Sequence, residues 1–458
     1  MAQNRQDMGS GPVKPLLLQL MIPAVVAQVV NLLYNIVDRI YIGHIEGIGA
    51  AALTGVGLFA PILMLLNAFA MLIGAGGAPR TAIALGQDNK DEAEKIIGNS
   101  FTMLLFFAVV LTAGFYAGAP ALLRLFGASD ATLPYAVAYG RIYILGSVFV
   151  LLVMGMNPFI TTQGFAKISM LTTVIGAVIN IILDPILIFG LGWGVRGAAV
   201  ATVLSQVASA VLTLRCIVGS QGMPWHIRAE KLRLHGDVFA AICTIGVPAA
   251  AQSAMYNISN MFIQSSMNSF GTSTIAAWGV YGKIDFLFWM TINSLGIAIT
   301  TFAGQNFGAR QYDRVRRGVR VCLAMAACTT LVISFTFYNL AEVLFRLFSQ
   351  DDAVVAVGVG MMHVLTPVYI TYVCIEVLAG ALRGCGDVRV PTLITVFFVC
   401  GLRMLWLFIA VPIRHEVATV EMSYPITWSL ASALFILYYV KGGWMQRCAE
   451  KWEKKQAG

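Results

Sequence analysis

Twelve apolar runs of membrane-spanning length limit this 458-residue chain to one kind of fold. A helix needs about 20 apolar residues to cross the hydrocarbon core of a bilayer. Hydrophobic residues make up 58% of the chain and charged residues only 11%, which is more apolar surface than a soluble protein of this length buries. The runs lie at about 15–41, 50–76, 96–122, 134–158, 166–190, 196–218, 238–265, 275–303, 319–345, 355–380, 390–412 and 422–441. We therefore predict an all-α, multi-pass membrane protein with twelve transmembrane helices.

Lysine and arginine residues are distributed unevenly between the two ends of these runs. With a cytoplasmic N-terminus, 22 of the 30 fall in cytoplasmic segments and six in outer segments, while Lys283 and Arg403 lie within spans. This bias predicts that both termini are cytoplasmic, in the inner membrane of a cell. It also explains the net charge of +8 without a nucleic-acid partner. The first run has no small-residue cleavage site at its end, which predicts an uncleaved helix.

The second half of the sequence repeats the first. Matched pairs are Pro23 with Pro248 and Asn35 with Asn260 at an offset of 225, and Arg124 with Arg346 and Asp130 with Asp352 at an offset of 222. Six spans per half is an even number, so both halves enter from the same side, as in a parallel repeat. We expect an N-lobe over residues 1–218, a cytoplasmic linker over 219–237, a C-lobe over 238–441 and a basic cytoplasmic tail over 442–458.

Polar residues form a stripe on the first span. Asn31, Tyr34, Asn35 and Asp38 are three, four and seven residues apart, so they share one face of a helix. A carboxylate in hydrocarbon costs several kcal/mol, which predicts that Asp38 faces a protein interior or a water-filled cavity. Pro23, earlier in this span, is a predicted hinge. The acid is absent from the repeat, where Ile263 takes its place.

The fifth span carries a second acid. Asn180 and Asp184 lie one helical turn apart, and Pro185 cannot donate a hydrogen bond to the carbonyl of Ile181. Pro185 is therefore a second predicted hinge, next to a candidate proton or sodium site. Asp38 and Asp184 both fall late in helices that start on the cytoplasmic side, so they could face each other. The choice between H⁺ and Na⁺ stays open.

Other polar residues in the spans are candidates for the same site or for a substrate cavity. Asn157 and Thr202 are assigned to the coupling-ion site, although such side chains also join helices without further function. The substrate-cavity candidates are Tyr34, Asn35, Gln206, Gln252, Tyr256, Asn257, Asp285 and Glu376. Lys283 could pair with an acid of a neighbouring helix, Glu376 being one candidate, and Arg403 could extend its charge towards the membrane surface. Both residues could instead be part of the substrate pathway, and a structural role is favoured.

Several stretches together resemble the multidrug and toxic compound extrusion (MATE) family. They are LYNIVDRIYIGHIEGIGAAALTGVG, LDPILIFG, RGAAVATVLSQ and LRGCGDVRVP, in that order along the chain. The resemblance implies two six-helix lobes in a V shape. It also implies export of cationic or amphiphilic compounds in exchange for H⁺ or Na⁺. Asp38, Asn157, Asn180, Asp184 and Thr202 match the N-lobe ion site of one bacterial and archaeal branch. The seventh span has no acid, so a C-lobe sodium site is not expected.

We therefore predict a secondary active multidrug antiporter rather than an enzyme. Its partners would be small cationic or amphiphilic compounds and membrane lipid, it would act as a monomer, and H⁺ or Na⁺ would be its only inorganic requirement. The eight cysteines form no CxxC pair and have no histidines at metal spacing, so no other metal or cofactor is expected. One alternative is a flippase for a lipid-linked precursor. Another is a membrane-embedded transferase, whose magnesium would need paired acids such as Asp351 and Asp352.

Overall fold

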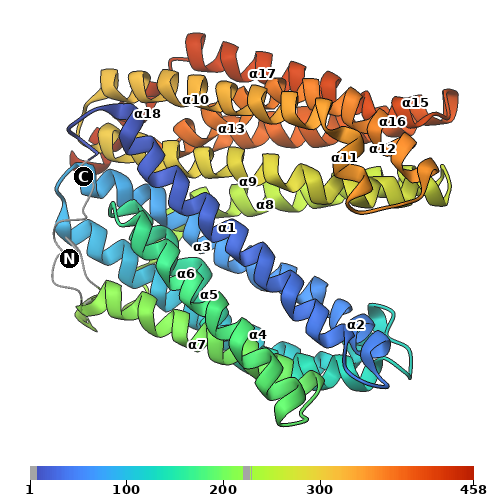
Figure 1. The fold of residues 1–458 in the computed structure, drawn as a ribbon. Coiled ribbons are helices and arrows are strands. Elements are labelled where there is room, and N and C mark those ends of the chain that lie inside the picture. The colour runs from blue at the N-terminus through green and yellow to red at the C-terminus, as the bar shows by residue number, and fades with distance from the viewer. Residues whose placement is uncertain (1–7, 220–226, 228, 458) are drawn as a thin grey trace. The chain divides into compact units, whose positions relative to one another are not determined.

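The computed structural model describes residues 8–219, 227 and 229–457, and within these ranges all regular structure is helical (Figure 1). The helices are α1 (Val13–Gly43), α2 (Gly49–Gly57), α3 (Ala60–Gly86), α4 (Lys90–Leu125), α5 (Leu133–Thr162), α6 (Ala166–Pro185), η2 (Ile186–Gly190), α7 (Val195–Gly219), η3 (Ala229–Lys231), α8 (Gly236–Asn268), α9 (Thr272–Gly308), α10 (Tyr312–Asn339), α11 (Ala341–Arg346), α12 (Asp352–Leu365), η4 (Thr366–Val368), α13 (Tyr369–Gly384), α14 (Arg389–Ile394), η5 (Thr395–Gly401), α15 (Leu402–Ile413), α16 (Val417–Glu421), α17 (Ser423–Lys441) and α18 (Trp444–Ala457).

Twelve helical segments of the described chain are long and apolar enough to cross a bilayer, which confirms the predicted fold class. Two of them differ most from the sequence prediction in their bounds. The second span joins α2 and α3 over Gly49–Gly86. The ninth was expected to reach residue 345 but ends at Asn339, and the short helix α11 follows it. Hydropathy alone did not separate α10 from α11 because the residue between them, Leu340, is also apolar.

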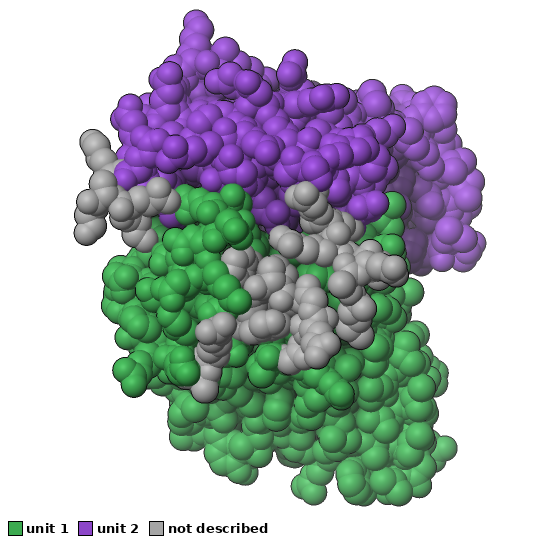
Figure 2. Space-filling view, turned by 90° about the vertical axis from the view of Figure 1, so that its left-hand side faces the viewer, with its two compact units in different colours: residues 1–7, 22–250 green, residues 8–21, 251–458 purple. Residues whose placement is uncertain are grey.

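The chain divides into two compact units, coloured separately in Figure 2. Unit 1 contains Ile22–Ala250, and unit 2 contains Met8–Met21 and Ala251–Gly458 among the described residues. Both divisions fall inside long helices, in α1 beside Pro23 and in α8 just after Pro248. The start of α1 thus belongs to unit 2, and the start of α8 belongs to unit 1.

Two reciprocal glycine contacts hold the start of α8 within unit 1. A Cβ atom on Gly76 of α3 would collide with the carbonyl oxygen of Ile242, and one on Gly246 of α8 would collide with the carbonyl oxygen of Leu72. The two glycines therefore let the backbones of α3 and α8 touch, the usual way in which membrane helices gain packing energy.

The start of α1 is fixed within unit 2 by polar contacts to the backbone just before the helix. Asn306 of α9 donates to the carbonyl oxygen of Met8 at 3.1 Å. Arg314 of α10 donates to the carbonyl oxygens of Met8 at 3.0 Å and Ser10 at 2.8 Å. Leu17 and Leu20 of α1 are fully buried.

The end of the expected linker packs on α4 in unit 1. Lys231 forms an ion pair with Asp91, and Asn99 donates to the carbonyl oxygen of His235 at 3.0 Å. The rest of the segment expected as a linker includes residues 220–226 and 228, which lie outside the described residues, as do residues 1–7 of the expected N-lobe and residue 458 of the tail.

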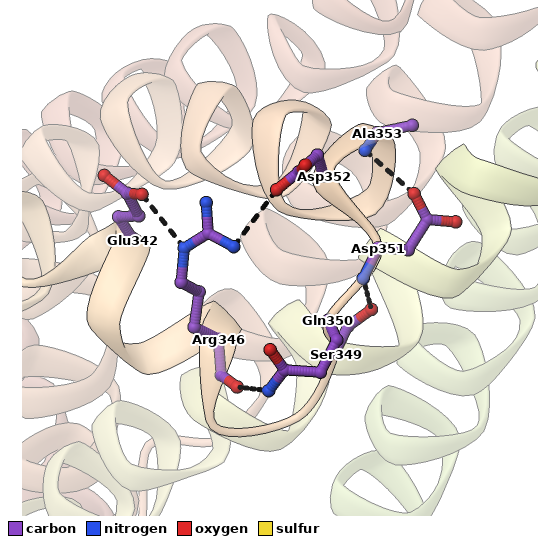
Figure 3. Close-up of polar contacts among 7 residues, drawn as sticks. All are labelled: Glu342, Arg346, Ser349, Gln350, Asp351, Asp352 and Ala353. Carbon is purple, nitrogen blue, oxygen red and sulfur yellow. Dashed lines mark hydrogen bonds and ion pairs between the residues drawn. The ribbon is translucent and has the colours of Figure 1, made fainter.

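The sequence repeat recurs as a matching ion pair in each unit. Arg124 lies 3.6 Å from Asp130 in unit 1, and its repeat partner Arg346 lies 3.1 Å from Asp352 in unit 2 (Figure 3). Arg346 also donates to Glu342 at 3.0 Å, and these two acids raise the pKa of the Arg346 guanidinium. Both pairs are exposed, so they mark equivalent positions rather than large contributions to stability.

A π-helix interrupts the fifth span of each half. In unit 1, α6 ends at Pro185 and η2 follows, as expected from a proline that lacks the amide hydrogen needed to continue the α-helical pattern. In unit 2, η5 lies between α14 and α15, and the Thr395 hydroxyl at its start donates to the carbonyl oxygen of Pro391 at 3.0 Å. Such wide turns occur often at functional sites.

Candidate functional site

Unit 1 brings two acids from different spans together. Asp38 of α1 and Asp184 of α6 are both buried, with exposed fractions of 9% and 0%. Their carboxyl groups interact directly with each other. Two ionised carboxylates in such a site repel strongly in a low dielectric, so a proton or a cation must balance them.

Asn180 and Thr202 complete this group. Asn180 donates through Nδ2 to Asp184 Oδ1 at 3.4 Å and to the Thr202 hydroxyl at 3.5 Å, and it is fully buried. Thr202 of α7 donates in turn to the carbonyl oxygen of Ala198 at 3.0 Å. The structure thus joins four of the five residues assigned to the ion site.

Three oxygen atoms in the group have no hydrogen-bond donor within the described chain. They are Oδ1 of Asp38, Oδ1 of Asn180 and Oδ2 of Asp184. Buried polar atoms are normally satisfied, because an unmet hydrogen bond costs about 1–3 kcal/mol. Three acceptors without donors form the oxygen-rich arrangement that a proton or a hard cation such as Na⁺ would complete.

Asn157, the fifth residue, lies in a different polar group. Its side-chain oxygen accepts from Thr172 at 3.1 Å and from Thr213 at 3.5 Å. Thr172 precedes Asn180 by eight residues on α6, roughly 12 Å along the helix axis. Helical spacing could not reveal this separation, because it fixes the face of each helix but not the depth at which two helices meet.

Three tyrosines surround the acids. Tyr34 of α1 lies near both Asp38 and Asp184, and the Tyr139 hydroxyl interacts with Thr202. Tyr139 and Tyr143 of α5 are buried, and their rings stack with centroids 5.8 Å apart. Sequence reasoning missed the last two. Their spacing of four residues in a span was the available signal, but aromatic pairs of this kind are common in helix packing.

A hollow of about 1160 Å³ lies next to η2 in the same unit. It is lined in part by Ile188 and Phe189 of η2, His44 after α1, and Trp193 before α7. Asp184 precedes η2 by two residues, but neither Asp184 nor Asp38 is among the residues that line the hollow. The remaining unit 1 candidates are less enclosed: Gln206 is half-buried, and Asn35 is exposed and donates to the Asn31 carbonyl at 2.7 Å.

Unit 2 holds its acids in a network of aromatic side chains. Asp285 of α9 accepts from the Tyr369 hydroxyl at 2.5 Å and from the indole N–H of Trp289 at 2.6 Å. Glu376 of α13 accepts from Tyr372 at 3.4 Å. In unit 1, by contrast, one carboxylate oxygen of each acid has no donor among the described residues.

The predicted cavity residues of unit 2 are only partly joined to this network. The hydroxyl of Tyr256 lies 3.1 Å from that of Tyr372, whereas Gln252 is half-buried and Asn257 is exposed. Tyr369 and Tyr372 were not predicted from the sequence, because nothing in the sequence shows which aromatic residues of a span face an acid.

Two basic residues behave differently from the sequence expectation. Lys283 does not pair with Glu376; it is exposed, and its ammonium group lies 5.6 Å from the ring centroid of Phe348. Arg403 does not extend towards the membrane surface. It is 2% exposed, and its guanidinium carbon lies 4.3 Å from the ring centroid of Tyr424.

The adjacent acids Asp351 and Asp352 have structural roles (Figure 3). Asp351 accepts from the backbone N–H of Ala353 at 2.9 Å and so caps α12, while Asp352 binds Arg346. Within the described ranges, no group of three or more His, Cys, Asp or Glu side chains is arranged to hold a metal ion. All eight cysteines are free thiols.

Comparison with known proteins shows the family signature over most of the chain. The MatE family model matches residues 23–186 and 248–409. A protein of Bacillus subtilis (strain 168) called "Probable multidrug resistance protein YoeA" is 25% identical over 432 residues, 92% of each chain. A Shewanella oneidensis protein called "FAD transporter" is 24% identical over 358 residues, covering 77% of this chain and 78% of its own.

The fold is also similar to solved structures. One described as "Crystal structure of MATE in the bent conformation" superposes with a TM-score of 0.88 at 23% identity and covers 98% of both chains.

Proposed function

The chain belongs to the MatE family, and on that premise we propose that it is a secondary active transporter that exports drug-like organic compounds in exchange for H⁺ or Na⁺. The proposed coupling to an ion rests on one observation, the three buried oxygen atoms without donors on Asp38, Asn180 and Asp184. Similarity to a probable multidrug resistance protein over 92% of the chain supports the export half.

The coupling step would act through the acid pair. With the site empty, the two carboxylates repel each other; a proton shared between them, or a Na⁺ ion held by the three oxygens, removes that repulsion. Because the acids lie on α1 and α6, the bound ion draws these helices together. A bound ion would therefore shift unit 1 between two conformations, which is how ion binding can drive transport.

Prolines would localise the movement. Pro23 interrupts the hydrogen bonding of α1, and Pro185 ends α6 directly after Asp184. We place the hinges at these residues, with ion binding bending α1 and favouring the outward-facing state that releases the substrate. The 22-to-6 distribution of basic residues supports cytoplasmic termini in the inner membrane.

The test is efflux of the cationic dye ethidium from proteoliposomes under an imposed pH gradient or an imposed Na⁺ gradient. We expect one gradient to drive efflux by the wild-type protein and Asp184→Asn to lose it. The matched control is Asp130→Asn, which changes an exposed acid in the same unit.

Two results would contradict the proposal. Wild-type efflux by Asp184→Asn would remove the acid pair from coupling. Absence of gradient-driven movement of any dye would instead favour the flippase alternative and a lipid-linked substrate.

A further inference from the structure

Arg403 is a buried charge whose hydrogen bonds are not satisfied. It lies two residues after η5 in a membrane span and is 2% exposed. Its Nε and Nη2 atoms have no partner within the described chain. A charged group inside a membrane protein is costly, and such residues usually serve a pathway or a ligand.

The surroundings of Arg403 are aromatic and include a further unsatisfied N–H donor. The guanidinium carbon lies 4.3 Å from the ring centroid of Tyr424 and 5.9 Å from that of Trp428, both on α17. The indole Nε1 of Trp428 and the hydroxyl of Ser423, on the buried face of the same helix, also lack partners among the residues described.

The acids of unit 2 do not neutralise this group. Asp285 is held by Tyr369 and Trp289, and Glu376 is held by Tyr372. Glu421 is buried, and it forms no ion pair with Arg403 in the described chain. The unsatisfied N–H groups of Arg403 and Trp428 are therefore donors at a positive charge, which is the arrangement that an anion would complete.

An irregular stretch of backbone lies next to Arg403. The π-helix η5 directly precedes α15, and π-helical turns occur often at functional sites. Trp428 joins Arg403 to a cluster of aromatic rings: Tyr372 and Trp428 are tilted, with centroids 5.1 Å apart, and Trp289 and Tyr372 meet edge to face, with centroids 4.7 Å apart.

We propose that Arg403 and the indole N–H of Trp428 form an anion-recognition subsite in unit 2 that binds the carboxylate or phosphate of an aromatic exported compound. The proposal rests on the export function proposed above and names a substrate class for it. The planar guanidinium suits bidentate binding of such groups, and the neighbouring rings suit an aromatic body.

The test compares riboflavin with flavin mononucleotide, which differ by one phosphate group. Binding to detergent-solubilised protein is followed by flavin fluorescence, and export is followed in proteoliposomes, with ethidium as a cationic reference. We expect the wild-type protein to bind flavin mononucleotide more tightly than riboflavin. Arg403→Met should remove about tenfold or more of the affinity for flavin mononucleotide, the scale of a lost charged hydrogen bond, and leave riboflavin and ethidium unchanged.

Two further variants sharpen the result. Arg403→Lys keeps the charge but not the planar fork, so it should retain only part of the preference. Arg414→Met removes an exposed arginine just after α15 and should behave as wild type.

Three outcomes would overturn the subsite: equal affinity of the wild type for both flavins, an unchanged preference in Arg403→Met, or an equal loss for all three compounds, which would indicate a structural role. Competition by phosphatidylglycerol vesicles but not by phosphatidylcholine vesicles, without a preference between the flavins, would assign the site to a lipid headgroup instead. Failure of the wild type to export ethidium would contradict the proposed function, whereas the binding measurement would still decide the subsite.

Discussion

At the acid pair of unit 1 the buried atoms without partners are oxygen acceptors on Asp38, Asn180 and Asp184, whereas at Arg403 and Trp428 in unit 2 they are N–H donors. Each group lies beside the π-helix of the fifth span of its half, two residues before η2 or two residues after η5. The two halves thus share a backbone feature and differ in the sign of the charge placed next to it. At the repeat offset of 222, Asp184 corresponds to Trp406 and η2 to residues 408–412, so the two π-helices lie at different positions in their spans.

The largest expected effect is that of Asp184→Asn on coupling. Replacing one carboxylate by an amide removes both the repulsion and the proton site, so gradient-driven ethidium efflux should fall to the level of empty vesicles. Asp130→Asn should keep wild-type rates. Equal losses in both variants would mean that the effect is not specific to the acid pair.

Arg403→Met tests whether the buried charge of unit 2 is present for stability. Replacing a buried ion without a partner by an apolar residue of similar length should stabilise the protein, by about 1–4 kcal/mol. The measurement is the thermal unfolding midpoint in detergent, with Arg414→Met as the control. A lower midpoint would mean that stacking on Tyr424 and Trp428 outweighs the cost of burying the charge.

Asp285→Asn tests whether the unit 2 acids are structural. The side-chain NH₂ group of the new asparagine would face the indole N–H of Trp289, and two donors cannot bond to each other. One hydrogen bond is therefore lost, and the protein should be destabilised by about 1–3 kcal/mol. The gradient dependence of ethidium efflux should stay the same. A change of the driving ion in this variant would place part of the coupling in unit 2 and end the contrast between the units.

The smallest effect is expected at the repeated ion pairs. Arg124→Gln and Arg346→Gln each remove an exposed pair, and such pairs contribute little. Neither unfolding midpoint should shift measurably, and the two variants should behave alike. A large shift in only one of them would show that the outer ends of the two units differ more than the ion pairs suggest.

The transmembrane spans and part of the candidate ion site could be predicted from the sequence for physical reasons. Transmembrane helices must be continuous apolar runs, so their number follows from hydropathy. Asn180 and Asp184 are four residues apart, and helical geometry alone places them on one face of α6, with Pro185 next to them. The assigned roles of these residues remain predictions, as does the choice between H⁺ and Na⁺.

Contacts between helices were much harder to predict. Three features of the sites depend on how helices pack against one another. They are the depth of Asn157 in the membrane span, the positions of Tyr139 and Tyr143 around the acids, and the position of Arg403 beneath Tyr424. A single basic residue in a span can reach the membrane surface or turn inward, and hydropathy is the same in both cases. The repeat predicted matching spans, but not where the helix of each fifth span breaks or which charge lies beside that break.

The most direct test of the contrast measures Asp184→Asn and Arg403→Met side by side, with ethidium and flavin mononucleotide, in proteoliposomes under the driving gradient. We predict that Asp184→Asn loses gradient-driven export of both compounds and that Arg403→Met loses export of flavin mononucleotide alone. Loss of ethidium export in Arg403→Met, or gradient-driven export in Asp184→Asn, would contradict the assignment of coupling to unit 1 and anion recognition to unit 2.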